Sequence, residues 1–173
     1  MTSTLAPADA QASETAGFFD PERRFGGLAR LYGVEGAARI RAAHVAVVGI
    51  GGVGSWAVEA LARSGVGRLT LVDMDHVAES NVNRQIHATT TTLGQAKIDA
   101  MRDRIGLINP ACEVHCVDDF VTEANWPALL PVPVDAVIDA CDQVRAKVAM
   151  AAWSLRTKTP FIAVGAAGGK RWA

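Results

Sequence analysis

From Arg39 onward, short apolar runs bounded by glycine or aspartate alternate with longer stretches of helix length. Such runs, with few charged positions, are typical of strands buried on both faces of a parallel sheet. We predict strands at 44–49, 68–73, 113–118, 134–139 and 161–165, and helices at about 52–64, 94–107 and 144–157.

Alternation of strands with helices indicates an α/β fold. We predict a Rossmann-like, doubly wound, mainly parallel sheet of about five strands, with helices on both faces and right-handed crossovers. In such a sheet a ligand binds in the crevice at the carboxyl ends of the strands, so polar residues at those positions are candidates for the chemistry.

The first 22 residues have a different composition from the rest. They are rich in Ala, Thr and Ser, and they contain four acids and no Lys or Arg. We interpret residues 1–22 as a disordered acidic tail and residues 23–173 as one domain. The remainder then carries 17 basic and 14 acidic side chains, so it is mildly basic.

Composition excludes several classes of protein. Half of the 173 residues are apolar and 20% are charged, which fits a chain with a sizeable core. Three cysteines without a C-x-x-C motif exclude a disulfide scaffold and a four-cysteine zinc site. No apolar run approaches the ~18 residues of a membrane helix, and the N-terminus lacks the basic region of a signal peptide. We expect a cytoplasmic location and no membrane partner.

A glycine-rich turn follows the first predicted strand directly. It reads Gly49-Ile50-Gly51-Gly52-Val53-Gly54, which is G-x-G-x-x-G between a strand and a helix. The first glycine permits a tight turn, the second lets the backbone approach a phosphate, and the third lets the helix pack on the strand. Asp73 ends the next strand, where a carboxylate can hold a ribose hydroxyl pair. At this point NAD, FAD and ATP all remain candidates.

A polar segment just after Asp73 favours a nucleotide triphosphate over a dinucleotide. Its Asn81 and Arg84, followed by Lys97 at the start of a helix, would place cations near phosphates. Asp142 follows the fourth strand and could hold Mg²⁺ together with phosphate oxygens. Taken singly, Arg84 and Lys97 could be solvated charges and Asp142 could be a helix N-cap.

As a set these motifs resemble the adenylating superfamily of ThiF, MoeB and the ubiquitin-activating enzymes, over about residues 23–169. The resemblance implies catalytic roles for Arg84, Lys97 and Asp142, and a metal at Asp142. It implies adenylation of a substrate carboxylate by ATP with Mg²⁺, in a homodimer. The implied ATP contacts are Gly49, Gly51, Gly52, Gly54, Asp73, Asn81, Arg84, Lys97 and Asp142.

Within the superfamily, the chain is similar to the branch of tRNA threonylcarbamoyladenosine dehydratases. The residues that carry this likeness are 24–33 (RFGGLARLYG), 67–73, 83–88 and 165–169. The likeness implies ATP-dependent cyclisation of threonylcarbamoyladenosine beside the tRNA anticodon, with a cysteine desulfurase system as a conceivable partner. The carbamoyl oxygen would close the ring and expel AMP, so no protein nucleophile is needed.

Two departures from the related patterns stand out. Sulfur-carrier activators have an arginine that reaches the ATP of a partner subunit, and that position is Gly27 here, with Arg24 and Arg30 as neighbouring cations. Members of the dehydratase branch also continue well beyond residue 173, so we interpret 23–173 as a C-terminally truncated adenylating domain. Strand 161–165 is then expected to lie at a sheet edge.

Three alternative functions stay open. The first is an adenylyltransferase acting on the C-terminal Gly-Gly of a sulfur-carrier protein. The second is a non-catalytic ATP- or tRNA-binding fragment, and the third is an NAD dehydrogenase. We interpret Cys112, Cys116 and Cys141 as packing residues, and we assign no role to His87, which lies close to the polar segment.

Overall fold

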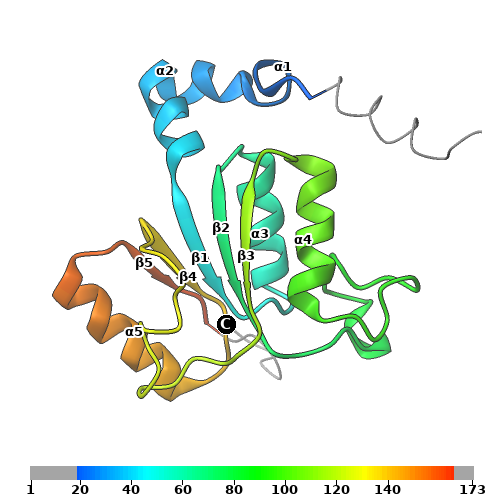
Figure 1. Ribbon diagram of the computed structural model, residues 1–173, viewed down its shortest axis with the longest axis vertical. Coiled ribbons are helices and arrows are strands. Elements are labelled where there is room, and N and C mark those ends of the chain that lie inside the picture. Colours follow the sequence, from blue (N-terminus) through cyan, green and yellow to red (C-terminus); the bar gives the residue numbers. More distant parts are fainter. Residues whose placement is uncertain (1–18, 166–173) are drawn as a thin grey trace, which may run out of the picture.

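The computed structural model describes residues 19–165 and forms one parallel sheet with helices on both faces (Figure 1). The strands are β1 (His44–Val48), β2 (Arg68–Val72), β3 (Glu113–Val117), β4 (Ala136–Asp139) and β5 (Phe161–Ala163). Their order in the sheet is β3-β2-β1-β4-β5, and every neighbouring pair is parallel. The predicted doubly wound α/β fold is therefore confirmed.

Alternate residues of the central strands face two separate cores. Val45 and Val47 of β1 pack in one core with Leu69 and Leu71 of β2 and with helices α3 (Gly54–Arg63) and α4 (Lys97–Ile108). Ala46 and Val48 point to the opposite face, where helix α5 (Val144–Thr157) covers them. Successive residues of β1 face opposite sides of the sheet, and both sides are covered. The β1 sequence is therefore apolar at every position after His44.

Burial on both faces, which we predicted for all five strands, is wrong for the two edge strands. No residue of β3 or β5 is fully buried, and Ile162 of β5 is 60% exposed. An edge strand has a neighbour on one side only, and in β3 and β5 the helices cover the faces incompletely. The prediction that the last strand lies at an edge is confirmed for the part of the chain that the structure describes.

Two helices precede the sheet where no helix was predicted. Helix α1 (Pro21–Phe25) begins at Asp20, whose carboxylate accepts hydrogen bonds from the N–H groups of Glu22 and Arg23. The last residues of the predicted tail therefore form a capped helix start, while residues 1–18 lie outside the described residues. Helix α2 (Gly27–Ala42) buries only Ala37, so its sequence shows no clear apolar stripe. Among residues 19–165, no helix is both long and apolar enough to cross a bilayer.

Candidate active site

The carboxyl ends of β1, β2 and β4 surround a cleft of about 690 Å³, a size typical of small-ligand sites. Residues from seven separate segments of the chain line this cleft. Most of the residues selected from the sequence are among them: Gly49, Gly51, Gly52, Asp73, Asn81, Arg84, Lys97 and Asp142. The structure therefore brings together, at one edge of the sheet, residues that lie up to 93 positions apart in the chain.

The glycine loop runs along one wall of the cleft, and its glycines have distinct steric roles. Gly49 has a φ of +86°, and a Cβ there would lie 2.8 Å from the backbone nitrogen of Cys141. A Cβ at Gly51 would meet no protein atom within 4 Å, so this backbone is open to a ligand. Gly54 does not line the cleft: it opens α3 against the carbonyl of Gly49, which is a packing role.

The carboxylate of Asp73 ties the glycine loop to the end of β2. Its Oδ2 accepts a hydrogen bond of 2.6 Å from the N–H of Ile50, and its Oδ1 accepts one of 2.8 Å from the N–H of Asp75. Each carboxylate oxygen has a second lone-pair direction, so Asp73 can still accept bonds from a ligand's hydroxyl groups. The geometry holds this acid in place before any ligand binds.

Lys97 is the cation most strongly buried in the cleft. Its side chain is 8% exposed, and its Nζ lies 2.7 Å from Oδ2 of Asp75. The backbone N–H of Lys97 also donates to the carbonyl of Asp75, so the start of α4 is fixed to the segment after β2. We did not select Asp75 from the sequence, although it lies two residues after Asp73 and its contact with Lys97 spans 22 positions.

Arg84 and Asn81 lie on the loop that closes the other side of the cleft. Asn81 is buried in the short 3-10 helix η3 (Glu79–Asn81), and its Oδ1 accepts a 3.0 Å hydrogen bond from the N–H of Ala78. Arg84 is exposed, and its Nη1 donates to the carbonyl of Ser80. Its side-chain methylenes lie against Gly52, where a Cβ would be 3.4 Å away. The guanidinium is thus held over the glycine loop.

Asp142 presents an exposed carboxylate to the cleft. The alternative interpretation, in which it caps helix α5, is wrong: the N-cap is Gln143, and no side chain caps this helix. Within residues 19–165 no cluster of three or more His, Cys, Asp or Glu side chains could by itself hold a metal. A Mg²⁺ at Asp142 would therefore take most of its ligands from phosphate oxygens and water, as Mg²⁺ commonly does.

A buried ion pair that we did not predict supports the floor of the cleft. Asp139, the last residue of β4, is fully buried, and its Oδ2 lies 2.9 Å from Nζ of Lys147 on α5. Its Oδ1 accepts a hydrogen bond from the N–H of Cys141, and Lys147 also donates to the carbonyl of Val164. The pair fixes the turn that carries Cys141 and Asp142, and no local sequence pattern indicates it.

The remaining candidate residues either lie outside the cleft or have a side chain that is unreactive at neutral pH. Burial, together with a hydrogen bond to Asp139, raises the pKa of the Cys141 thiol to about 11, so it is protonated at neutral pH. His87 does not line the cleft; burial, and then the charges of Lys97 and Arg104, lower its pKa to about 4. Arg24 and Arg30 are both absent from the cleft lining.

The fold and this cleft define a doubly wound α/β protein with a ligand site at the strand ends, where the glycine loop, Asp73 and the cations Arg84 and Lys97 meet. The ThiF family matches residues 25–170, and the chain belongs to that family.

Two curated relatives are tRNA threonylcarbamoyladenosine dehydratases. The Haemophilus influenzae protein is 50% identical over 149 residues, which cover 86% of this chain and 57% of the relative. The Escherichia coli K12 protein is 53% identical over 148 residues, 86% of this chain and 55% of the relative. A crystal structure of the E. coli dehydratase TcdA in complex with ATP has a TM-score of 0.82 at 52% identity, covering 86% of this chain and 61% of that one. The chain thus spans little more than half the length of the curated relatives that it matches.

Proposed function

We propose that this chain carries the adenylation site of a tRNA threonylcarbamoyladenosine dehydratase. The observation that carries the proposal is the cleft, which joins the open glycine loop, Asp73, Arg84, Lys97 and Asp142 in one space. It is supported by the identity of about half of all aligned residues to the two dehydratases, and by the likeness to a dehydratase structure with bound ATP. Residues 23–173 would form this adenylating domain.

The residues of the cleft suit a nucleoside triphosphate in one orientation. Asp73, held by two backbone N–H groups, would accept the ribose hydroxyls. The backbone of Gly51 and the amino end of α3 would face the phosphates, because helix N-termini attract anions. Arg84 and Lys97 would neutralise negative charge as pyrophosphate leaves. Asp142 would hold Mg²⁺, whose role is to screen and polarise the phosphates when it is bound.

The proposed reaction has two steps. A carboxylate oxygen of threonylcarbamoyladenosine attacks the α-phosphorus of ATP, which forms an acyl-adenylate and breaks the bond to pyrophosphate. The neighbouring carbamoyl oxygen then attacks the acyl carbon, AMP leaves, and the carbamoyl nitrogen loses a proton. The net change is loss of one water from the modified nucleoside and cleavage of ATP to AMP and pyrophosphate.

The second step needs no nucleophile from the protein, because the attacking oxygen is part of the same substrate. The state of Cys141 supports this. It is the cysteine that lines the cleft, and its raised pKa of about 11 leaves almost no thiolate at neutral pH. A covalent thioester on this thiol is therefore disfavoured, and the proposed role of the protein is to bind, orient and neutralise charge.

The proposal also includes a substrate, a cellular location and partner proteins. The substrate would be a tRNA with threonylcarbamoyladenosine next to its anticodon, and the setting would be the cytoplasm. A homodimer and a cysteine desulfurase partner belong to the same proposal, on the strength of the family resemblance. The cation that sulfur-carrier activators place in a partner's ATP site is replaced by Gly27, at the start of α2.

The test is AMP and pyrophosphate formation by this 173-residue chain, with and without threonylcarbamoylated tRNA. Arg84→Ala removes a cation from the cleft, and Arg102→Ala, which changes an exposed arginine of α4, is the matched control. We expect AMP formation that depends on the modified tRNA, is lost in Arg84→Ala and is kept in Arg102→Ala.

Other outcomes separate the alternatives. AMP formation with a sulfur-carrier protein ending in Gly-Gly, and none with tRNA, would establish the adenylyltransferase instead. Binding of ATP without any exchange of pyrophosphate into ATP would establish a non-catalytic nucleotide-binding fragment. Quenching of nicotinamide fluorescence on binding of NADH, with no binding of ATP, would establish a dinucleotide site.

A further inference from the structure

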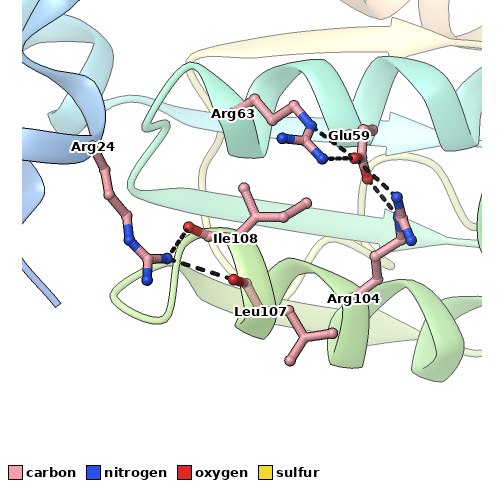
Figure 2. A network of polar contacts seen from close by, with 6 residues as sticks. All are labelled: Arg24, Glu59, Arg63, Arg104, Leu107 and Ile108. Carbon is pink, nitrogen blue, oxygen red and sulfur yellow. Dashed lines mark hydrogen bonds and ion pairs between the residues drawn. The ribbon is translucent and has the colours of Figure 1, made fainter. Parts of the chain in front are cut away.

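A second cavity, of about 460 Å³, lies between helices α1, α3 and α4, and three arginines line it. Arg24 comes from α1, Arg63 is the last residue of α3, and Arg104 lies in the last turns of α4 (Figure 2). We call these three residues the arginine cluster. Helix α3 begins at the glycine loop, so its far end is about 14 Å from that loop at 1.5 Å per residue. The cluster is therefore separate from the cleft.

One acid offsets only part of the charge of Arg63 and Arg104. Glu59 is 6% exposed, and it accepts hydrogen bonds of 2.8 Å from Nε of Arg63 and 2.6 Å from Nε of Arg104 (Figure 2). Burial alone would raise the pKa of Glu59, but the bonds from Arg104 and Arg63 outweigh it and lower that pKa. Glu59 is thus ionised at neutral pH, with one negative charge against two positive charges.

Arg24 is held by backbone rather than by an acid. Its Nη1 donates to the carbonyl of Ile108 at 2.7 Å and lies 3.5 Å from the carbonyl of Leu107, at the end of α4 (Figure 2). The carboxyl end of a helix carries only a partial negative charge, so most of the positive charge of the Arg24 guanidinium is not offset there. The cluster and Glu59 together have a formal charge of +2.

Each guanidinium is anchored through part of its donors and keeps others for a ligand. In the described part of the chain, the Nη1 groups of Arg63 and Arg104 and the Nη2 group of Arg24 have no acceptor. Anchoring reduces the side-chain entropy that is lost when a ligand binds. Planar guanidiniums with free N–H groups match the oxygens of a phosphodiester, which can accept two bonds from one arginine.

We propose that the arginine cluster binds backbone phosphates of the tRNA whose modified nucleoside occupies the cleft. The identity of the RNA rests on the proposed function. Helix α3 runs from the carboxyl ends of the strands back to their amino ends, so the cluster lies at the opposite edge of the sheet from the cleft (Figure 1). A tRNA is far larger than the cleft and carries a phosphate at every nucleotide, so a tRNA with one nucleotide in the cleft can extend along α3 and place further phosphates at this edge. The excess of two positive charges favours such a polyanion over a neutral surface.

The test compares two double variants of equal charge. Arg24→Gln/Arg63→Gln removes two members of the cluster and leaves Arg104 to pair Glu59. Arg68→Gln/Arg102→Gln removes two half-exposed arginines that pair with exposed acids elsewhere. Binding of an unmodified tRNA transcript is measured between 50 and 300 mM salt. ATP affinity and the thermal midpoint are measured on the same samples, and Arg63→Gln alone is included in case the double variant unfolds.

We expect the cluster variant to bind tRNA about tenfold more weakly per lost contact, with a salt slope that falls by about 1 for each arginine. The control pair should change neither value by more than about twofold. Equal behaviour of the two double variants, or a wild-type chain that binds ATP but no tRNA, would overturn the proposal. So would equally tight binding of poly-glutamate, which would indicate an acidic protein partner. The two proposals can also fail separately. If the cluster variant weakens tRNA binding as expected but the wild-type chain forms no AMP with modified tRNA, only the dehydratase chemistry is refuted.

Discussion

Replacing His87 by leucine should remove most of an acid sensitivity that is built into the fold. His87 is 2% exposed, and neither of its ring nitrogens has a hydrogen-bond partner within residues 19–165. Protonation would place a positive charge in this buried site, close to the like charges of Lys97 and Arg104, which is why the pKa falls. Leucine has a similar volume and no titratable group.

The direction and size of the stability change follow from the difference in the pKa of His87 between the folded and the unfolded chain. The pKa of His87 is about 4 in the folded chain against 6.5 for an ordinary histidine, so between these values the unfolded chain binds more protons. Stability from the neutral imidazole is therefore complete above pH 6.5 and is lost as the pH falls. Between pH 7 and pH 5 the loss in the free energy of unfolding is about 2 kcal/mol.

Urea unfolding of wild type and His87→Leu at pH 7 and pH 5 measures this directly. We expect the wild type to lose about 2 kcal/mol more than the variant over this interval, and the two to be similar at pH 7. Burial also lowers the pKa of His44, but that residue is present in both proteins and cancels in the difference. An identical loss in both proteins would refute the argument that His87 is kept neutral by its surroundings.

Two further predictions concern the carboxylates at the end of β4. Lys147→Met removes the partner of the fully buried Asp139. It should lower the free energy of unfolding in urea by about 3–5 kcal/mol, because an unpaired charge is left inside. Adding Asp139→Asn should restore part of this loss, and no restoration would contradict the pairing argument. Asp142→Asn should leave ATP binding without Mg²⁺ unchanged and abolish the increase in affinity that Mg²⁺ gives, measured by calorimetric titration. An unchanged Mg²⁺ effect would remove Asp142 from the metal site.

Much of the fold could be predicted from local pattern. The apolar runs of β1 and β2 are buried on both faces, so their sequences leave no ambiguity, and the three helices between strands follow at the predicted places. Helices α1 and α2 were missed because they bury so little: Ala37 is the buried residue of α2, and an unburied helix leaves no apolar period.

Only part of the candidate site could be predicted from the local sequence. Gly49, Gly51, Gly52, Asp73 and Asp142 could be selected because each lies within four residues of the carboxyl end of a strand, and all five line the cleft. Gly54 packs α3 against the loop, as predicted for the third glycine, and its selection as a ligand contact stays a prediction.

Asp75, Asp139 and the arginine cluster could not be selected from the sequence. Their partners lie between 4 and 84 positions away, and a charged residue alone does not show what faces it. The sequence by itself determined the strands and the glycine loop, because these depend on local backbone and burial. Only the tertiary structure decided which charges meet, because ion pairs are made by the packing of elements that are distant in the chain.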